Sequence, residues 1–369
     1  FTSLLSEGII PGVGGIVIFI PQIAFLFLFI SILEETGYMS RVVFLMDRVM
    51  RKYGLSGKSI VPLISGTACA IPAIMATRNI ENWKERLITI LVTPFTTCSA
   101  RLPVYLILIS LVIPDERFLG VNAQGLTLMG LYLLGFFAAI FSAKILNNIL
   151  KIRSKTFFVV EMPNYKFPLL RNVFFTVFEK TKSFVFEAGK IIMAISILLW
   201  GLASFGVGDQ FNNAEKIIVV ENYNSIDEYE NKLSSHKLEH SLLGAMGKSI
   251  EPLISPLGYD WKIGIAIVTS FAAREVFVGT LATIYSVQGD QEETIKERMA
   301  NEVREDGQPV FGLASGISLM IFYAFAMQCM STLAIVYRET NHIKWPIIQF
   351  LYMGVMAYLS SFIAFQLLS

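Results

Sequence analysis

The sequence is poor in histidine, cysteine and charge. Its 369 residues include only three histidines and three cysteines, and only 16% of them are charged. Three cysteines cannot build a disulfide framework, and simple packing as small buried hydrophobic residues is the plain explanation for each. The histidines (His236, His240 and His342) all lie outside the apolar runs. This argues against a bis-histidine haem site and against histidine–metal catalysis inside a membrane.

Apolar side chains, in contrast, are abundant. Hydrophobic residues make up 54% of the chain, and phenylalanine alone occurs 29 times. A soluble domain of this size would not tolerate that composition, so we expect a polytopic membrane protein in contact with a lipid bilayer. The net charge of +1 indicates no particular partner, and we expect no nucleic-acid partner. The chain opens at Phe1 without a charged, signal-like start, which suggests a fragment whose N-terminal part is absent.

Apolar runs long enough to cross a bilayer, which takes about 20 helical residues, recur along the chain. They are 12–33, 121–143, 188–206, 309–336 and 346–368. Three further apolar stretches, 59–77, 86–113 and 261–287, are interrupted by SGTACAIP, TPFTTCSARLP and SFAARE. Backbone that leaves a helix at membrane depth is tolerated only where protein or a hydrated cavity surrounds it. In transporters such breaks form the substrate site.

Two segments, 38–52 and 169–190, have basic residues on one face and apolar residues on the other, which predicts interfacial amphipathic helices. The first is followed by GLSGKS at 54–59, and a near copy, GAMGKS, occurs at 244–249. Both lack the first glycine of the phosphate-binding loop, Gly-x-x-x-x-Gly-Lys-Ser/Thr. We therefore expect no nucleotide site here, and we expect Lys58 to reach the lipid headgroups.

The distribution of charge orients the chain, because short cytoplasmic loops are enriched in Lys and Arg. The basic stretches 41–58 and 144–182 are expected to face inward, and the acidic stretches 207–243 and 288–308 outward. Both basic stretches face inward only if an even number of crossings separates them. Three apolar stretches, 59–77, 86–113 and 121–143, lie between them, so one of the three is expected not to cross. The broken stretch 59–77 is therefore predicted to be a re-entrant hairpin. The same parity makes 261–287 re-entrant from the outer side.

The resulting order of elements occurs twice with opposite orientation, which is an inverted repeat. In the preferred register Gly54 pairs with Gly258 and Lys58 with Lys262, because this aligns the apolar runs and the breaks. The predicted fold is all-α, with broken or re-entrant helices and interfacial amphipathic helices. Its parts are a first transmembrane repeat at 1–150, a basic interfacial segment at 151–190, and a second repeat at 191–369 with extramembrane loops 207–243 and 288–308.

Polar and sulfur-bearing side chains gather at the helix breaks. They are Cys69 in the first break, Thr97, Cys98, Ser99 and Arg101 in the second, Arg274 and Glu275 in the third, and Gln328 and Cys329 in the last. Ionisable groups inside a membrane are costly and are functional hypotheses by default. A structural ion pair is the alternative explanation for Arg274 and Glu275, and packing is the alternative for the cysteines.

Thiolate, carboxylate and thioether ligands together suit a borderline-soft divalent transition metal, whereas Mg²⁺ prefers oxygen alone. The candidate metal ligands are Cys69, Cys98, Glu275, Cys329 and Glu35, which ends the first helix. Thr97, Ser99, Arg101, Arg274 and Gln328 are the candidate pore or gating residues. Met75, Met327 and Met330 would add sulfur near two breaks, although most methionines in so apolar a chain fill the core.

A second metal motif lies in the acidic outer stretch. HKLEH, at 236–240, has the H-x-x-E-H spacing in which two histidines bind zinc and the glutamate acts as a base. A zinc hydrolase using His236, Glu239 and His240 is therefore an alternative function. The loop is too short to build a protease domain, which favours a chance match.

Four stretches carry a resemblance to a known family. They are LEETGYMSRVVFLMDRVMRKYGLSGKSIVPLISGTACAIPAIMATR, RLITILVTPFTTCSARLPVY, PLGYDWKIGIAIVTSFAAREVFVGTLATIY and STLAIVYRET. The chain resembles, from end to end, the membrane part of the prokaryotic ferrous iron transporter family FeoB. The resemblance implies two gate-type repeats of the kind found in nucleoside permeases. It also implies Fe²⁺ uptake across the bacterial cytoplasmic (inner) membrane, with Cys69, Cys98 and Glu275 at motif positions along the path.

The resemblance also sets expectations about partners and cofactors. In the family a GTP-binding domain, a helical regulatory region and one further transmembrane helix precede this part, so GTP would act only through a domain absent here, and the chain is expected to be a transporter rather than an enzyme. A homo-oligomer and small cytoplasmic Feo accessory proteins are expected partners. Many relatives have a Pro-Cys pair where this chain has Gln328–Cys329, which leaves a helix break there less certain. A nucleoside or other organic-solute permease of the gate fold is the alternative within transport.

Overall fold

The computed structural model describes residues 9–118, 121–150, 165–206, 233, 236–271, 274, 276–284, 299, 309–327 and 329–369. The described part is helical except for one short antiparallel pair, β1 (Arg117–Phe118) and β2 (Val121–Asn122). Two predicted site residues, Glu275 and Gln328, lie outside the described residues, as do most of the predicted outer loops 207–243 and 288–308. The predicted all-α membrane fold is confirmed.

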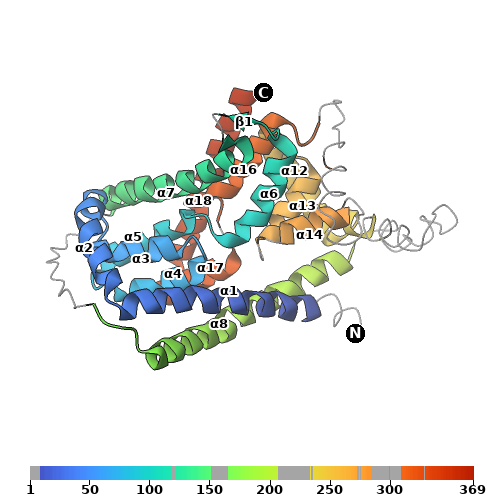
Figure 1. Cartoon of the computed structure of the whole chain (residues 1–369). Coiled ribbons are helices and arrows are strands. Elements are labelled where there is room, and N and C mark those ends of the chain that lie inside the picture. Colours follow the sequence, from blue (N-terminus) through green and yellow to red (C-terminus); the bar gives the residue numbers. More distant parts are fainter. Residues whose placement is uncertain are drawn as a thin grey trace.

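Two series of helices follow one another in the same order (Figure 1). Each has a long helix, an amphipathic helix, two short helices, a broken helix and a final long helix. The first series is α1 (Ile10–Glu35), α2 (Tyr38–Met50), α3 (Ile60–Ser65), α4 (Ala70–Ala76), α5 (Trp83–Val92), α6 (Leu102–Val112) and α7 (Ala123–Ile149). The second is α8 (Leu170–Ser204), α12 (Leu242–Ile254), α13 (Trp261–Ser270), α14 (Val276–Ile284), α16 (Leu313–Phe325), α17 (Met330–Thr340) and α18 (Lys344–Leu368). These are the two repeats.

Each pair of short helices folds back on itself. In the first repeat, the chain leaves α3 at Gly66, starts α4 after Cys69, and returns so that Lys58 Nζ lies 3.0 Å from Glu81 Oε1. In the second, α13 and α14 lie side by side, and Thr269 Oγ1 is 2.9 Å from Thr280 Oγ1. The two interrupted stretches are therefore hairpins, as the parity of the charged loops predicts.

A broken span follows each hairpin. Trp83–Val112 and Leu313–Thr340 are both apolar and long enough to cross a membrane. The first is interrupted between α5 and α6, where Pro94 has no N–H to continue the helical ladder. The second is interrupted between Phe325 and Met330 without any proline. The helix break at Cys329 therefore exists although the Pro-Cys pair is absent.

The two glycines of the predicted register have the same backbone conformation. In the first repeat the short 3₁₀ helix η2 (Arg51–Tyr53) ends at Gly54, which has a φ of 79°. In the second repeat the short 3₁₀ helix η8 (Ser255–Leu257) ends at Gly258, which has a φ of 81°. A Cβ atom on Gly54 would meet the side chain of Asn147, near the end of α7, and a Cβ on Gly258 would meet the ring of Phe365, near the end of α18. The register that pairs these glycines is therefore confirmed. The other, GLSGKS with GAMGKS, is wrong, because 244–249 lies inside α12.

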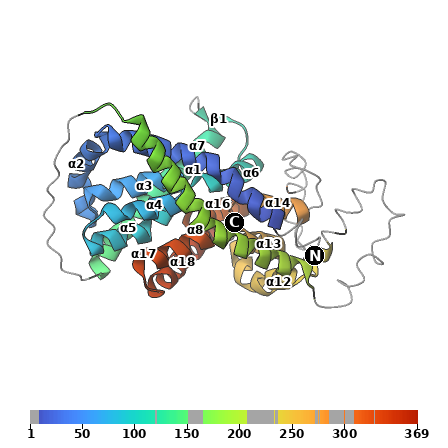
Figure 2. The same cartoon turned by 90° about the horizontal axis from the view of Figure 1, so that it is seen from below.

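The long helices α1 and α8 pack along each other (Figures 1 and 2). Asn172 Nδ2, at the start of α8, donates to Glu35 Oε1 over 3.1 Å at the end of α1. The later part of α1, Ile23–Glu35, meets the stretch Tyr38–Tyr53 at an angle of 84°, and the two are apolar and long enough to cross a membrane only when they are counted together. The separate span predicted at 12–33 is therefore not among the candidate spans of the described residues. α8 runs unbroken for 35 residues, so the boundary predicted at residue 190 falls within one helix.

The buried core lies between the repeats, and the long helices form the outside. Val104 and Tyr105 of α6 pack with Leu319 and Tyr323 of α16, all of them fully buried. In the most apolar part of α18 only 22% of the residues are buried, whereas 65% are buried in that of the broken span 313–340. Phenylalanines such as Phe137 on α7 are exposed, which is how helices that face lipid tails look.

Candidate functional site

All three cysteines lie where a helix begins after a break. Cys69 immediately precedes α4, Cys329 immediately precedes α17, and Cys98 precedes η6 (Ser99–Arg101), which leads into α6. Each has extended backbone and occupies the position before the first turn of a helix, where the first N–H groups have no partner within that helix. The N-terminal end of a helix favours negative groups, which suits a thiolate. Cys98 is buried, and the other two are partly exposed.

Equivalent main-chain hydrogen bonds join each broken span to its own hairpin. The N–H of Ser99, just after Cys98, donates over 3.4 Å to the oxygen of Ala68, just before Cys69, and Ser99 Oγ donates to the same oxygen over 2.9 Å. In the second repeat the N–H of Met330, just after Cys329, donates to the oxygen of Phe271 over 2.9 Å. In each repeat, the break of the spanning helix is thus hydrogen-bonded to the break of the hairpin.

The two pairs of breaks also meet each other. Arg274, in the turn of the second hairpin, is buried within electrostatic range of Arg101, Cys98 and Cys329. Its guanidinium carbon lies 4.9 Å from the centroid of the Tyr323 ring, in cation–π contact. One cysteine of each broken span, Cys98 or Cys329, therefore lies within electrostatic range of the same guanidinium between the repeats.

Arg101 connects the repeats directly. Although fully buried, it donates from Nη1 to the oxygen of Ala324 over 3.0 Å and from Nη2 to the oxygen of Ala326 over 2.7 Å. Both carbonyls lie where α16 ends, so no N–H group of a following helical turn donates to them. Arg101 thus holds the broken end of the opposite repeat through two main-chain acceptors.

Hydroxyl groups line the same region. Thr97 Oγ1 is buried beside the buried hydroxyl group of Tyr105. It faces Gly135 of α7, where an added Cβ would lie 3.1 Å from that oxygen. Beside the second break, Cys329 Sγ lies 3.2 Å from Thr332 Oγ1. Among the described residues, the side chains at the breaks therefore include thiols, hydroxyls and the guanidinium groups of Arg101 and Arg274.

Other predicted ligands lie elsewhere. Glu35 accepts from Asn172 at the joint of α1 and α8. Met75 belongs to an apolar cluster with Ile71 and Ile74, against which Cys69 also packs. The described residues contain no group of three or more His, Cys, Asp or Glu side chains placed to hold one ion. A closed metal centre is thus not formed by this part of the chain.

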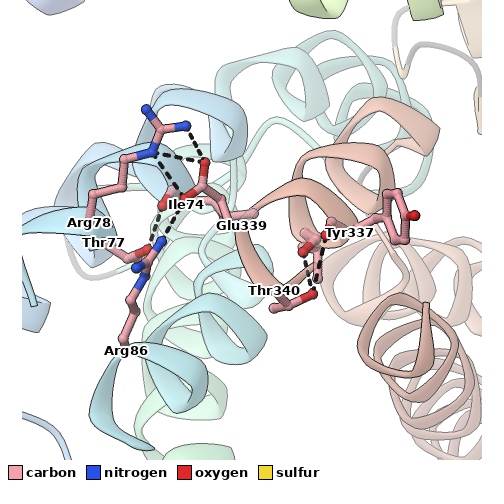
Figure 3. Close-up of polar contacts among 8 residues, drawn as sticks. Ile74, Thr77, Arg78, Arg86, Tyr337, Glu339 and Thr340 are labelled. Carbon is pink, nitrogen blue, oxygen red and sulfur yellow. Dashed lines mark hydrogen bonds and ion pairs between the residues drawn. The ribbon is translucent and has the colours of Figure 1, made fainter. Parts of the chain in front are cut away.

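Sequence reasoning missed Glu339, at the end of α17. Its buried carboxylate lies 2.5 Å from Arg78 Nη2 and 2.7 Å from Arg86 Nη2, and Arg78 Nε adds two bonds of 3.0 Å (Figure 3). We call these three residues the Glu339 cluster. Glu339 belongs to the second repeat and both arginines to the first. One signal was available: STLAIVYRET places a carboxylate within 11 residues of a predicted break.

Two side chains of α18 were also missed. Gln349 Nε2 donates to the oxygens of Ile90 and Leu91 over 3.4 Å and 3.1 Å, and the Tyr352 hydroxyl donates to Leu91 as well. In a continuous helix the Ile90 oxygen would accept a hydrogen bond from the N–H of residue 94, but Pro94 has no N–H. Each repeat therefore satisfies carbonyls that a break leaves free in the other.

The zinc motif at 236–240 does not have the geometry of a hydrolase site. Lys248 Nζ lies 3.0 Å from Glu239 Oε1, so the expected base is already in an ion pair. The two histidine rings do lie close together, with centroids 4.4 Å apart.

Comparison with known proteins gives a consistent result. The Gate family, described as "Nucleoside recognition", matches residues 16–111 and 185–343, and "Ferrous iron transport protein B C terminus" matches 128–180. The "Fe(2+) transporter FeoB" of Leptospira interrogans is 49% identical over 99% of this chain, and that of Leptospira biflexa is 46% identical. A "Fe(2+) transport protein A/Fe(2+) transporter FeoB fusion protein" of Porphyromonas gingivalis is 35% identical.

These matches concern part of each relative. The chain spans about half the length of the curated relatives it matches: 50% of the Leptospira interrogans protein, 51% of the Leptospira biflexa protein and 44% of the fusion protein. No solved structure matches the chain. Because the Gate match covers most of the sequence and the FeoB relatives align with all of it, the chain belongs to the Gate family and, within it, to the membrane part of FeoB.

Proposed function

We propose that this chain forms the path by which Fe²⁺ crosses the bacterial cytoplasmic membrane into the cell. The observation that carries the proposal is the 49% identity, over 99% of the chain, to a protein named Fe(2+) transporter. The site is compatible with that cargo, because Cys98 and Cys329, which come from different repeats, lie within electrostatic range of each other. Sulfur ligands suit a borderline-soft divalent ion better than a hard one.

The path would run between the two repeats, past the helix breaks. A partly dehydrated ion would exchange water for the thiols of Cys69, Cys98 and Cys329, with Thr97 Oγ1 and free carbonyls as further ligands. Weak and successive sites are what conduction requires, since an ion bound by a closed cage would not leave. The lack of a three-ligand group among the described residues is in keeping with such a path.

The two buried arginines constrain this path. Arg101 is committed to the carbonyls of Ala324 and Ala326, so its role is to fix the positions of the breaks. Its charge and that of Arg274 would repel a cation unless negative groups lie closer to it. The thiols of Cys98 and Cys329, both within electrostatic range of Arg274, would supply that charge only as thiolates.

The inner end of the path would lie near the Glu339 cluster. Lys58, Arg78 and Arg86 support the assignment of this end to the basic face, which we infer to be the cytoplasmic one because short inner loops are enriched in Lys and Arg. The cluster ties the end of α17 to the first repeat, and α17 carries Cys329 at its other end. Release of Glu339 would therefore allow α17 to move relative to Cys98.

Metal uptake into proteoliposomes is the direct test. Purified protein would be reconstituted under reducing conditions and supplied with Fe²⁺, Mn²⁺ or Zn²⁺, with a labelled nucleoside in a parallel sample. Saturable Fe²⁺ uptake above protein-free liposomes is the expected result. Nucleoside uptake without metal uptake, from protein shown to be folded, would overturn the proposal in favour of an organic-solute permease.

The nucleoside alternative has one observation in its favour, the description "Nucleoside recognition" of the matching family. A nucleoside site would need amide and carboxylate groups arranged to read a base and a ribose. Cysteine, threonine and serine occupy the described break positions instead. An enzyme built on 236–240 is disfavoured because Glu239 is paired with Lys248.

Partners follow from the relatives as a proposal. The Porphyromonas gingivalis protein joins "Fe(2+) transport protein A" to FeoB in one chain. We infer that a small protein of that kind contacts the cytoplasmic face of this chain, where the basic residues lie. Any effect of GTP would come through a separate nucleotide-binding domain, since neither GLSGKS nor GAMGKS forms a phosphate-binding loop.

A further inference from the structure

Two histidines lie one helical turn apart at the outer end of the second repeat. His236 and His240 lie directly before α12, where a β-bridge joins Gly206 to Ser241 beyond the end of α8. α8 starts on the inner side, beside Glu35, and its 35 residues extend about 52 Å at 1.5 Å per residue. The histidines are thus on the face opposite the basic loops.

The two imidazoles face each other. Their ring centroids are 4.4 Å apart and their planes are inclined by 42°. The spacing of four residues places both side chains on one side of a helical turn, as in many metal-binding pairs. Leu238, between them, packs with Leu243 and Trp261 in an apolar cluster that fixes this turn against α12 and α13.

Hydrogen bonding determines which nitrogen of His240 is available. Its Nδ1 lies 3.0 Å from the main-chain oxygen of His236. A carbonyl oxygen only accepts, so Nδ1 carries the proton, and the neutral ring has its lone pair on Nε2. Histidines that bind metals are commonly oriented in this way, by donating the other ring N–H to a carbonyl.

The other ring has an unsatisfied nitrogen. His236 Nε2 is buried and lacks a hydrogen-bond partner among the described residues. Such groups are rare, and coordination of an ion is one way in which they are satisfied. The nearby carboxylate of Glu239 does not compete for the imidazoles, because it is paired with Lys248.

We propose that His236 and His240 form a two-histidine site for a divalent first-row transition ion on the outer face, with water in the remaining coordination positions. Imidazole nitrogen suits iron, zinc, copper and nickel alike. Two protein ligands hold an ion less firmly than a closed four-ligand site, which permits transfer inward. Use of this site to capture Fe²⁺ before transport rests on the proposed function, whereas the binding of an ion does not.

Equilibrium dialysis of the purified full chain against Zn²⁺, an air-stable probe, tests the site. His236→Gln and His240→Gln are each expected to bind one ion fewer than the unchanged protein. His342→Gln is the matched control, because His342 is exposed and lies on the opposite face, after α17. Equal Zn²⁺ binding by all four proteins would overturn the proposal.

A rescue variant separates loss of a ligand from misfolding. His240→Cys replaces one zinc ligand by another and is expected to recover the lost ion. If His240→Gln loses the ion and His240→Cys does not recover it, the site is not a metal site. These measurements involve no transport. Histidine-dependent binding without Fe²⁺ uptake in proteoliposomes would disprove the proposed function alone, and Fe²⁺ uptake without such binding would disprove this site alone.

Discussion

The guanidinium of Arg101, in the first repeat, donates from Nη2 to the main-chain oxygen of Ala326, in the second, over 2.7 Å. The bond fills an acceptor that α16 leaves free where it ends. Gln349 of the second repeat does the same for Ile90 and Leu91 of the first. The two broken helices are therefore each stabilised by the opposite repeat, and neither repeat has its polar backbone satisfied alone.

Replacement of Arg101 by lysine is expected to destabilise the protein by about 1–3 kcal/mol. A lysine cannot reach two separate carbonyls in the fixed geometry of a guanidinium, so at least one buried acceptor loses its partner. Thermal unfolding in detergent measures the effect. Arg48→Lys, on the exposed face of α2, is the control and should leave the unfolding temperature unchanged. Equal unfolding temperatures for both variants would refute the role given to Arg101.

Glu339→Gln is expected to loosen the inner end of the protein and to alter Fe²⁺ uptake. The amide keeps the size of the side chain but leaves Arg78 and Arg86 without the carboxylate they share. Because both arginines are partly exposed, we expect a loss of about 1–3 kcal/mol rather than the larger cost of a fully buried pair.

Hydrogen exchange in the α17 peptide, read by mass spectrometry, would locate the change. Faster exchange near residues 330–340 is expected in Glu339→Gln, whereas Glu179→Gln, at an exposed position on α8, should leave the rate as it is. Unchanged exchange in Glu339→Gln would show that the Glu339 cluster does not hold α17.

Gly54→Ala and Gly258→Ala are each expected to cost about 1–2 kcal/mol, because L-residues disfavour the left-handed region and the new methyl group meets a side chain. Gly354→Ala, inside α18 with open space around it, is the matched control and should be neutral or stabilising. Unfolding temperatures of the three variants check the prediction. Similar values for all three would contradict the equivalence of Gly54 and Gly258.

Simultaneous Cys69→Ser and Cys98→Ser substitution is expected to lower Fe²⁺ uptake about ten-fold or more, since the hydroxyl is a poorer ligand than the thiol for such an ion. The initial rate of uptake into proteoliposomes is the measurement. Cys98→Ala is a second variant for the same measurement, because alanine still fills part of the buried space but has no atom that could bind the ion. An unchanged rate in the double variant would leave both cysteines as packing residues.

Much of the architecture was predictable because it depends on patterns along the chain. Apolar length predicts three of the candidate spans, at 121–143, 309–336 and 346–368, whereas the predicted spans 12–33 and 188–206 are not candidates by themselves among the described residues. Parity then requires the hairpins at 59–77 and 261–287, both of which are present. The repeat register followed from Gly54 and Gly258, because a chain reversal of this kind needs glycine wherever it occurs. The extent of α8 was not predictable, since its basic half and its apolar half look like two elements.

The residues at the helix breaks could be predicted from the sequence, but the contacts that these residues make could not. The sequence by itself determined that thiols and arginines occur at interruptions of apolar helices, because breaks and their composition are local properties of the chain. Only the tertiary structure decided that Arg101 serves carbonyls more than 220 residues away, and that Glu339 joins Arg78 and Arg86. These are contacts between repeats, and their partners are either backbone atoms, which have no sequence signature, or charges whose pairing depends on how the two repeats pack.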